Sequence, residues 1–290
     1  MKQIKLDFCD FWPGFGKTDN YFYRLLTRRY EVVLSDWPDY LIYSCFGKEH
    51  RRYKCVRIFY SGENRRADFR ECDYAFTFDY LDNPRHYRLP LYGLYHQPHE
   101  LVKSEDFDVE AVLREKTRFC SFVFSNSYAP ARNRFFHKLS KYKRVDSGGR
   151  YLNNVGGPIP DKLAFIKAYK FDVAFENSSY PGYTTEKITQ PMRTHTVPIY
   201  WGNPLVDRDF NPGSFVNYFD FRDEDELIEH IIRVDNDENL YREYLVQPCY
   251  HDNKVNEFVR PENVLGQFDH IFNNDVVPVA MRKRKRFVIF

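Results

Sequence analysis

Long apolar runs are missing from this 290-residue sequence, whose mean hydropathy is −0.64. No stretch of about 18 apolar residues occurs, which argues against a membrane-spanning helix of ordinary length. The first twelve residues carry Asp7 and Asp10 where a secretory signal would need an apolar core. We therefore expect a cytoplasmic protein.

Metal-binding and disulfide patterns are also missing. The six cysteines lie far apart with no Cys-x-x-Cys motif, so neither a zinc site nor a disulfide framework is predicted. His96 and His99 lie close together, but no third ligand is spaced with them. Pairs of the Asp-x-Asp kind, which hold metals in some transferases, occur only where helix starts or surface loops are expected. We therefore expect no metal ligands and no cofactor.

Outside the C-terminal end, positive and negative charges nearly balance, so the chain has no large net charge. The net charge is +2, and residues 282–286 alone contribute five positive charges, so the rest of the chain carries −3. This slightly negative net charge excludes a protein that binds polyanions in general over its surface. The basic run is flanked by apolar residues, which favours peripheral contact with an anionic membrane surface. A disordered solubilising end is the alternative, and a nucleic acid partner is not expected.

Aromatic residues are abundant instead, at 18% of the chain. They fit sugar-stacking surfaces as well as large cores, and composition does not choose between the two. The length suits two domains better than one, since domains of about 150 residues are typical.

Predicted strands and helices alternate along the chain in two consecutive sets. This pattern, without a long antiparallel run, predicts an α/β fold of two doubly wound domains facing across a cleft. We place the first domain at residues 1–116, the second at 117–275 and a basic and apolar tail at 276–290. Strands are predicted at residues 4–12, 31–34, 40–45, 56–60, 74–78, 119–125, 171–175 and 197–201, and helices at 19–29, 104–116, 130–140, 223–234 and 236–245, with another opening near residue 183.

A polar loop follows the predicted strand at residues 56–60. It reads Ser61, Gly62, Glu63 and Asn64. Open parallel sheets place their ligands at the carboxyl ends of strands, so this loop is a candidate binding site. A plain polar turn is the alternative.

The most informative stretch is residues 171–187, which predicts a strand, a tight turn and a helix start. Backbone N–H groups at that start, capped by Thr184 or its neighbour and supplemented by Lys187, would suit a diphosphate. The Glu186 carboxylate would be unfavourable beside a phosphate unless it faced ribose hydroxyls, as acids do in dinucleotide folds. A nucleoside diphosphate is therefore predicted, with a capped helix whose Glu186 and Lys187 are solvated as the alternative.

Pro191 falls seven residues after Thr184, inside the predicted helix. It removes one helical N–H and leaves the Lys187 carbonyl without its usual partner. We expect the helix to kink or to end early, while the binding role of its first turn is preserved.

Residues 171–187, taken with residues 195–204 (HTVPIYWGNP), resemble the donor-binding signature of the alpha-1,3/4-fucosyltransferase family, especially its short bacterial-type members. Residues 59–64 resemble the loop of that family's acceptor domain. Residues 122–126 with 129–133 resemble the opening of its donor domain. The similarity extends over about residues 2–250.

This resemblance implies a GT-B arrangement of two Rossmann-like domains. It implies an inverting enzyme that transfers L-fucose from GDP-fucose to a hydroxyl, expected to be O3, of N-acetylglucosamine in N-acetyllactosamine or Lewis-type glycans, without a metal cofactor. A non-catalytic protein that binds sugar nucleotides or glycans, and a GT-B transferase for another sugar nucleotide, remain alternatives. The roles implied are Glu63 as general base, Arg132 and Lys187 at the diphosphate, Glu186 at the ribose, Asn177 and Tyr183 in the rest of the donor pocket, and Asn64 and His96 at the acceptor.

Overall fold

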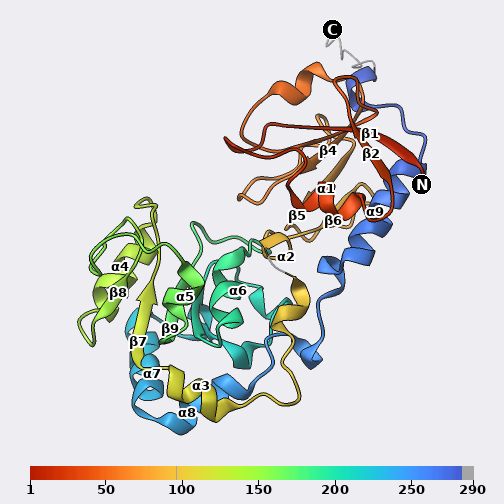
Figure 1. Ribbon diagram of the computed structural model, residues 1–290. Coiled ribbons are helices and arrows are strands. Elements are labelled where there is room, and N and C mark those ends of the chain that lie inside the picture. The colour runs from red at the N-terminus through yellow and green to blue at the C-terminus, as the bar shows by residue number, and fades with distance from the viewer. Residues whose placement is uncertain (96, 283–290) are drawn as a thin grey trace. The chain divides into compact units, whose positions relative to one another are not determined.

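The computed structural model describes residues 1–95 and 97–282, which form two compact units (Figure 1). The first unit comprises Met1–Leu94 together with the chain from Glu257 onwards, and the second comprises Tyr95–Asn256. Each unit is built on its own parallel β-sheet.

The sheet of the first unit has the strand order β2-β1-β3-β4-β5-β6, and every pairing is parallel. Strand β4 is buried at all five positions, as expected where both faces of a parallel sheet are covered. The chain reverses its direction of winding at β1, which creates a topological switch point between β1 and β3. The strands are β1 (Gln3–Cys9), β2 (Glu31–Leu34), β3 (Tyr40–Tyr43), β4 (Val56–Tyr60), β5 (Tyr74–Thr77) and β6 (His86–Arg88).

The first unit is completed by a helix from the far end of the sequence, α9 (Pro261–Asn273). Phe268 of α9 is buried and stacks on Phe76 of β5, with 4.8 Å between ring centroids. It also meets Phe22 of α1 (Tyr21–Leu26) at 6.1 Å. The helix therefore supplies part of the core of the first unit, and Figure 1 shows it beside α1.

This arrangement differs from the domain boundaries predicted at residues 116 and 275. The first boundary lies between Leu94 and Tyr95, because α3 (Val109–Glu115) packs against α8 (Glu238–Val246) of the second unit. The second lies between Asn256 and Glu257, since α9 belongs to the first unit.

The described part of the predicted tail at 276–290 contacts the first unit. The Val279 N–H donates a hydrogen bond of 2.8 Å to the buried Asp73 carboxylate of the first unit. Arg282 reaches the same carboxylate at 3.4 Å. Residues 283–290, which hold most of the basic run, lie outside the described residues.

The sheet of the second unit has the order β11-β10-β9-β7-β8, again parallel throughout. Counted within the unit, this is the same 2-1-3-4-5 order as in the first sheet, with the switch point between β7 and β9. The strands are β7 (Arg118–Phe122), β8 (Val145–Ser147), β9 (Tyr169–Phe175), β10 (Val197–Trp201) and β11 (Val216–Asn217).

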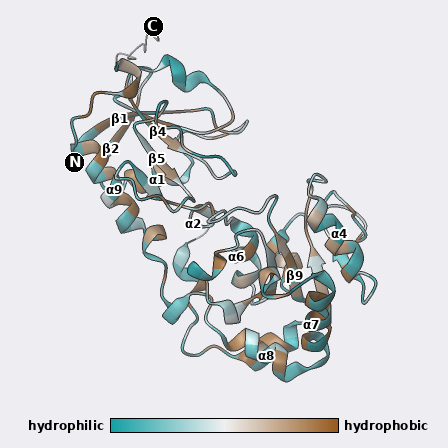
Figure 2. Ribbon diagram, turned by 180° about the vertical axis from the view of Figure 1, so that it is seen from behind, coloured by the Kyte–Doolittle hydropathy of each residue, from teal (hydrophilic) through white to brown (hydrophobic). Residues whose placement is uncertain are grey.

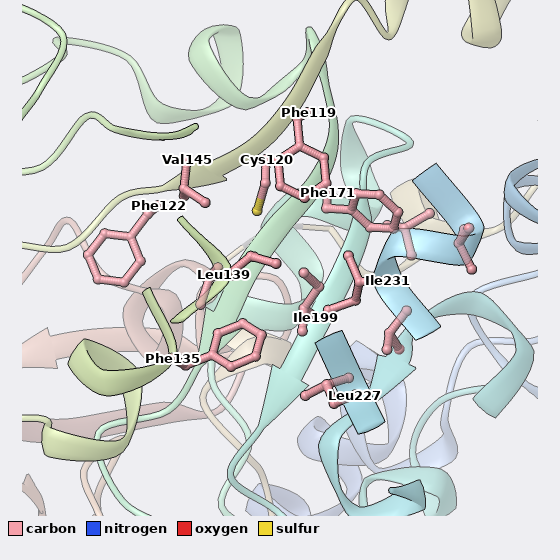
Figure 3. Packing of buried hydrophobic residues seen from close by; sticks show 14 of the residues in the cluster. Phe119, Cys120, Phe122, Phe135, Leu139, Val145, Phe171, Ile199, Leu227 and Ile231 are labelled. Atoms are coloured by element: carbon pink, nitrogen blue, oxygen red, sulfur yellow. The ribbon is translucent and has the colours of Figure 1, made fainter. Parts of the chain in front are cut away.

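One face of this second sheet carries the main apolar core of the unit (Figure 3). Side chains from β7, β9 and β10 meet α4 (Pro130–Leu139) and α7 (Glu224–Asn236) there. In Figure 2, apolar and polar segments alternate along α7 and α8, as expected of helices that bury one face. Because side chains alternate along a strand, Ser121 of β7 and Asp172 of β9 fall on the opposite face, beneath α5 (Lys162–Ile166) and α6 (Glu186–Arg193).

The predicted fold class is confirmed, since the chain forms two doubly wound α/β units. Three predicted strands, at residues 31–34, 56–60 and 197–201, match residue for residue. The short strands β6, β8 and β11 were not predicted. Helix α6 passes through Pro191 and ends two residues later, at Arg193. Across the described residues, no helix combines the length and the apolar character that a membrane span requires.

Replacing Phe268 with alanine should destabilise the first unit by about 3–5 kcal/mol, because it leaves a cavity where two aromatic rings now stack. Urea unfolding followed by circular dichroism would measure the loss. Phe46→Ala, which removes a half-exposed ring of the same unit, is the control and should lower the free energy of unfolding far less. Equal midpoints for the two variants would contradict the role of α9.

Candidate functional site

Arg132 of α4 lies at the switch point of the second sheet and is fully buried. Its guanidinium carbon lies 3.8 Å from the centroid of the Phe124 ring. One terminal nitrogen donates to the Asn126 carbonyl at 2.8 Å, and the other donates to Asn177 Oδ1 at 3.1 Å. This residue therefore ties the loop after β7 to the loop after β9, and two predicted site residues, Arg132 and Asn177, are brought together.

The guanidinium of Arg132 is not fully satisfied. Its Nε–H has no hydrogen-bond partner among the described residues. Burial lowers the pKa of Arg132 to about 10, against the opposing influence of Glu176, so the side chain stays charged at neutral pH. Burying a positively charged donor without an acceptor is unfavourable, unless a bound anion accepts its hydrogen bond.

The start of α6 is organised around Glu176, a residue that sequence reasoning did not single out. Its carboxylate is fully buried and accepts hydrogen bonds from the Thr185 N–H at 2.7 Å and the Thr185 hydroxyl at 2.8 Å. Lys187 Nζ pairs with the same carboxylate at 3.2 Å. Thr185 is also the N-cap of α6, in agreement with the predicted cap at Thr184 or its neighbour.

The position of Glu176 is enforced by its surroundings. Gly202 has φ +156°, and a Cβ there would lie 2.4 Å from Glu176 Cγ, so a side chain at this position would collide with it. Burial raises the pKa of Glu176, whereas Lys187 and the Thr185 donors oppose that rise. The available signal in the sequence was an acid at the end of an apolar strand, which stays buried only when it is paired.

Lys187 and Glu186 are not solvated, contrary to the alternative of a plain capped helix. The Lys187 side chain is only 13% exposed, and its Nζ lies 3.6 Å from Glu186 Oε1 as well as near Glu176. Burial alone would lower the pKa of Lys187, but the two carboxylates raise it above its ordinary value. The ammonium is thus a fixed charge in a largely desolvated setting.

The remaining predicted donor residues differ in exposure. Asn177 is exposed at the end of β9, whereas the Tyr183 side chain is buried. The turn between them is fixed by the Gly182 N–H, which donates to Asn203 Oδ1 at 2.7 Å.

Asp172 lies deeper on the same face of the second sheet and was not predicted as a site residue. It is buried, and its Oδ1 accepts a hydrogen bond of 2.6 Å from the Ser121 hydroxyl. Its Oδ2 has no partner within the described part of the chain. Burial raises the pKa of Asp172 to about 6, although the Lys162 ammonium nearby and the Ser121 hydroxyl act to lower it.

In the first unit, the loop after β4 holds Glu63 and Asn64 in one turn. The buried Ser61 hydroxyl accepts from the Glu63 N–H at 3.1 Å and donates to the Glu63 carbonyl at 3.0 Å. The Glu63 residue is exposed at the carboxyl end of the strand, and Asn64 is half-buried. His96 falls outside the described residues. Over residues 1–95 and 97–282, no three His, Cys, Asp or Glu side chains cluster as metal ligands would.

Both units match models of known families. Residues 6–95 match the alpha-(1,3)-fucosyltransferase FucT N-terminal domain, and residues 113–258, about half of the chain, match the C-terminal part of glycosyltransferase family 10 (fucosyltransferase). The chain belongs to glycosyltransferase family 10. The family resemblance seen in residues 171–204 is thereby confirmed.

Individual relatives agree with this family 10 assignment. The chain is 33% identical over 297 residues to alpha-(1,3)-fucosyltransferase FucT of Helicobacter pylori, an alignment that covers 88% of this chain and 62% of that protein. It therefore spans about three fifths of that relative's length. A crystal structure of an alpha1,3-fucosyltransferase with GDP-fucose superposes with a TM-score of 0.82 at 31% identity, covering 96% of this chain and 93% of the other. Human GDP-fucose protein O-fucosyltransferase 3 is 31% identical over 60% of this chain and 38% of its own length.

The Asp172→Asn variant should gain stability relative to the wild type as pH rises from about 4 to about 6. A carboxyl whose pKa is raised on folding stabilises the protein below its ordinary value of 3.8 and loses that contribution as pH rises through 6. The difference should reach roughly 3 kcal/mol. Urea unfolding at several pH values measures it, with the exposed Asp106→Asn as control. Parallel pH profiles for Asp172→Asn and the wild type would contradict the assignment.

Proposed function

We propose that this family 10 protein is an inverting fucosyltransferase. It moves L-fucose from GDP-fucose to a hydroxyl, expected to be O3, of N-acetylglucosamine in N-acetyllactosamine-type acceptors. The observation that carries the proposal is the buried, incompletely satisfied Arg132 at the switch point of the second sheet, beside the charged start of α6. The likeness to a solved alpha1,3-fucosyltransferase crystallised with GDP-fucose supports the choice of donor.

Arg132 and Lys187 act on the diphosphate in this proposal. As fucose leaves, GDP gains negative charge, and a cation about 4 Å away contributes on the order of 4 kcal/mol at an effective dielectric constant near 20, before desolvation. Lys187 donates to the Thr185 hydroxyl at 3.0 Å and pairs with the Glu176 and Glu186 carboxylates at 3.2 and 3.6 Å. We propose that its ammonium also donates to a phosphate oxygen of the donor. These side chains supply the charge that a metal supplies elsewhere, and we propose that no divalent cation is required.

The sugar and nucleoside contacts complete the donor site. Glu186, at the first position of α6, is assigned to the ribose hydroxyls, since a carboxylate accepts from hydroxyls but repels phosphate. Asn177 and Tyr183 are assigned to the rest of the pocket.

Glu63 is the proposed general base. It takes the proton of the acceptor hydroxyl while the oxygen bonds to the fucose carbon and GDP departs. A positioned base contributes about 10²- to 10⁴-fold to such a step. The Ser61 turn supports this role, because it fixes the backbone and leaves the carboxylate exposed. Asn64 and His96 are assigned to acceptor binding.

Peripheral membrane contact through the basic run, and a cytoplasmic location, remain proposals. The five basic residues at 282–286 would each contribute about 1 kcal/mol near anionic headgroups.

Glu63→Gln should reduce turnover at least about 10²-fold while GDP affinity is unchanged, since the amide keeps the shape but accepts no proton. The assay is release of GDP from GDP-fucose in the presence of N-acetyllactosamine. Glu31→Gln, an exposed acid of the same unit, is the control and should keep full turnover. Normal turnover by Glu63→Gln would remove this residue as base, and GDP-fucose binding without turnover on any glycan would favour a non-catalytic binding protein.

Lys187→Met should weaken GDP binding at least about tenfold by removing a charge-assisted hydrogen bond. It also leaves Glu176 unpaired and so lowers thermal stability. Adding Glu176→Gln should restore stability without restoring GDP affinity, which separates the two effects. Calorimetric titration with GDP measures the affinity, and an unchanged dissociation constant for Lys187→Met would contradict the phosphate role.

A further inference from the structure

A third basic residue, Lys162, lies in the same part of the second unit as Arg132 and Lys187. It opens α5, directly after the helix cap Asp161. Its Nζ lies 5.8 Å from the centroid of the Phe124 ring, the ring on which Arg132 is stacked. Two cations therefore share one aromatic ring at the switch point of the sheet, an arrangement in which the ring's negative faces favour positive charge.

The Lys162 ammonium lacks a polar partner among residues 1–95 and 97–282. Among the residues that the structure describes, no acceptor lies within hydrogen-bond distance of its Nζ and no carboxylate within ion-pair distance. The residue is partly buried, and burial lowers the pKa of its ammonium. A partly desolvated ammonium without hydrogen bonds to the protein is unfavourable unless water or a ligand supplies the acceptors.

The acids near Lys162 do not form an ion pair with its ammonium. Glu176 and Glu186 are already engaged by Lys187, at 3.2 and 3.6 Å. Asp172 lies on the face that α5 covers, yet it bonds to Ser121 through one oxygen and leaves the other unpartnered. Had Lys162 served only as a counter-ion for Asp172, the two would be expected to meet at ion-pair distance, and they do not.

We propose that Lys162 is a phosphate-binding residue of the donor site, donating from Nζ to an oxygen of the nucleotide diphosphate alongside Arg132 and Lys187. The inference rests on the proposed function, since it needs a nucleoside diphosphate as ligand. The Asp172 carboxylate then favours the charged form of the ammonium, while its own hydrogen bond goes to Ser121.

The test compares GDP with guanosine, which carries no phosphate. Lys162→Met should weaken GDP binding about tenfold or more, the value of a lost charge-assisted hydrogen bond, and should leave guanosine binding unchanged. Lys162→Arg should recover part of the GDP affinity. Lys167→Met, at the other end of the same helix and half exposed, is the matched control and should bind both ligands as the wild type does.

A double variant, Lys162→Met with Asp172→Asn, separates phosphate binding from a structural role. The double variant should stay as weak for GDP as the single one, because the lost contact is to the ligand. Recovery of wild-type GDP affinity in the double variant would show that Lys162 only balances Asp172 and would overturn the inference. Equal weakening of GDP and guanosine, or no weakening at all, would overturn it too. Failure of the wild type to bind GDP would instead overturn the proposed function, and this inference with it.

Discussion

The buried contact between Glu176 and the start of α6 is the constraint on which the candidate donor site depends. A carboxylate removed from water at the end of β9 needs donors, and it finds them in the N-cap Thr185 and in the ammonium of Lys187. Each partner is thereby fixed in turn: the helix begins where Thr185 is held, and Lys187 points back to the strand. The positive end of the helix, the buried cation and the exposed Asn177 are therefore held at one edge of the sheet before any ligand arrives, which lowers the entropic cost of binding.

Both units repeat one topology, and this explains where the two candidate sites lie. In each sheet the winding reverses at its first strand, and the loops at the carboxyl ends of the central strands carry the polar residues. Glu63 follows β4 in the first unit, and Asn126 and Asn177 follow β7 and β9 in the second. The same architecture thus presents an exposed acid in one unit and a desolvated set of cations in the other. In the proposed reaction, the acid takes the proton of the acceptor hydroxyl and the cations stabilise the departing diphosphate.

Much of this organisation could be predicted from the sequence, because strands buried on both faces read as apolar runs. Strands 56–60 and 197–201 are of that kind, whereas strand 31–34 is a partly exposed edge strand that was recognised from its short apolar run. The strands that were missed, β6, β8 and β11, have only two or three residues each, too few for a period to be recognised. Among site residues, Arg132 and Asn177 are in contact, but Glu176, Asp172 and Lys162 were overlooked. A buried acid or lysine has no local signature, since what keeps it buried is a partner distant in sequence.

The position of α9 has a consequence for how the protein is made. The second unit is continuous in sequence, whereas the first is interrupted by it and regains Phe268 only after some 160 intervening residues. On the ribosome, the N-terminal sheet is synthesised first, yet its aromatic core stays incomplete until α9 emerges. The second unit is complete once Asn256 has been synthesised, so it can fold before the first unit does. Until α9 has been synthesised, Phe22 and Phe76 lack the Phe268 ring, and the unfinished core leaves apolar surface that can misassemble.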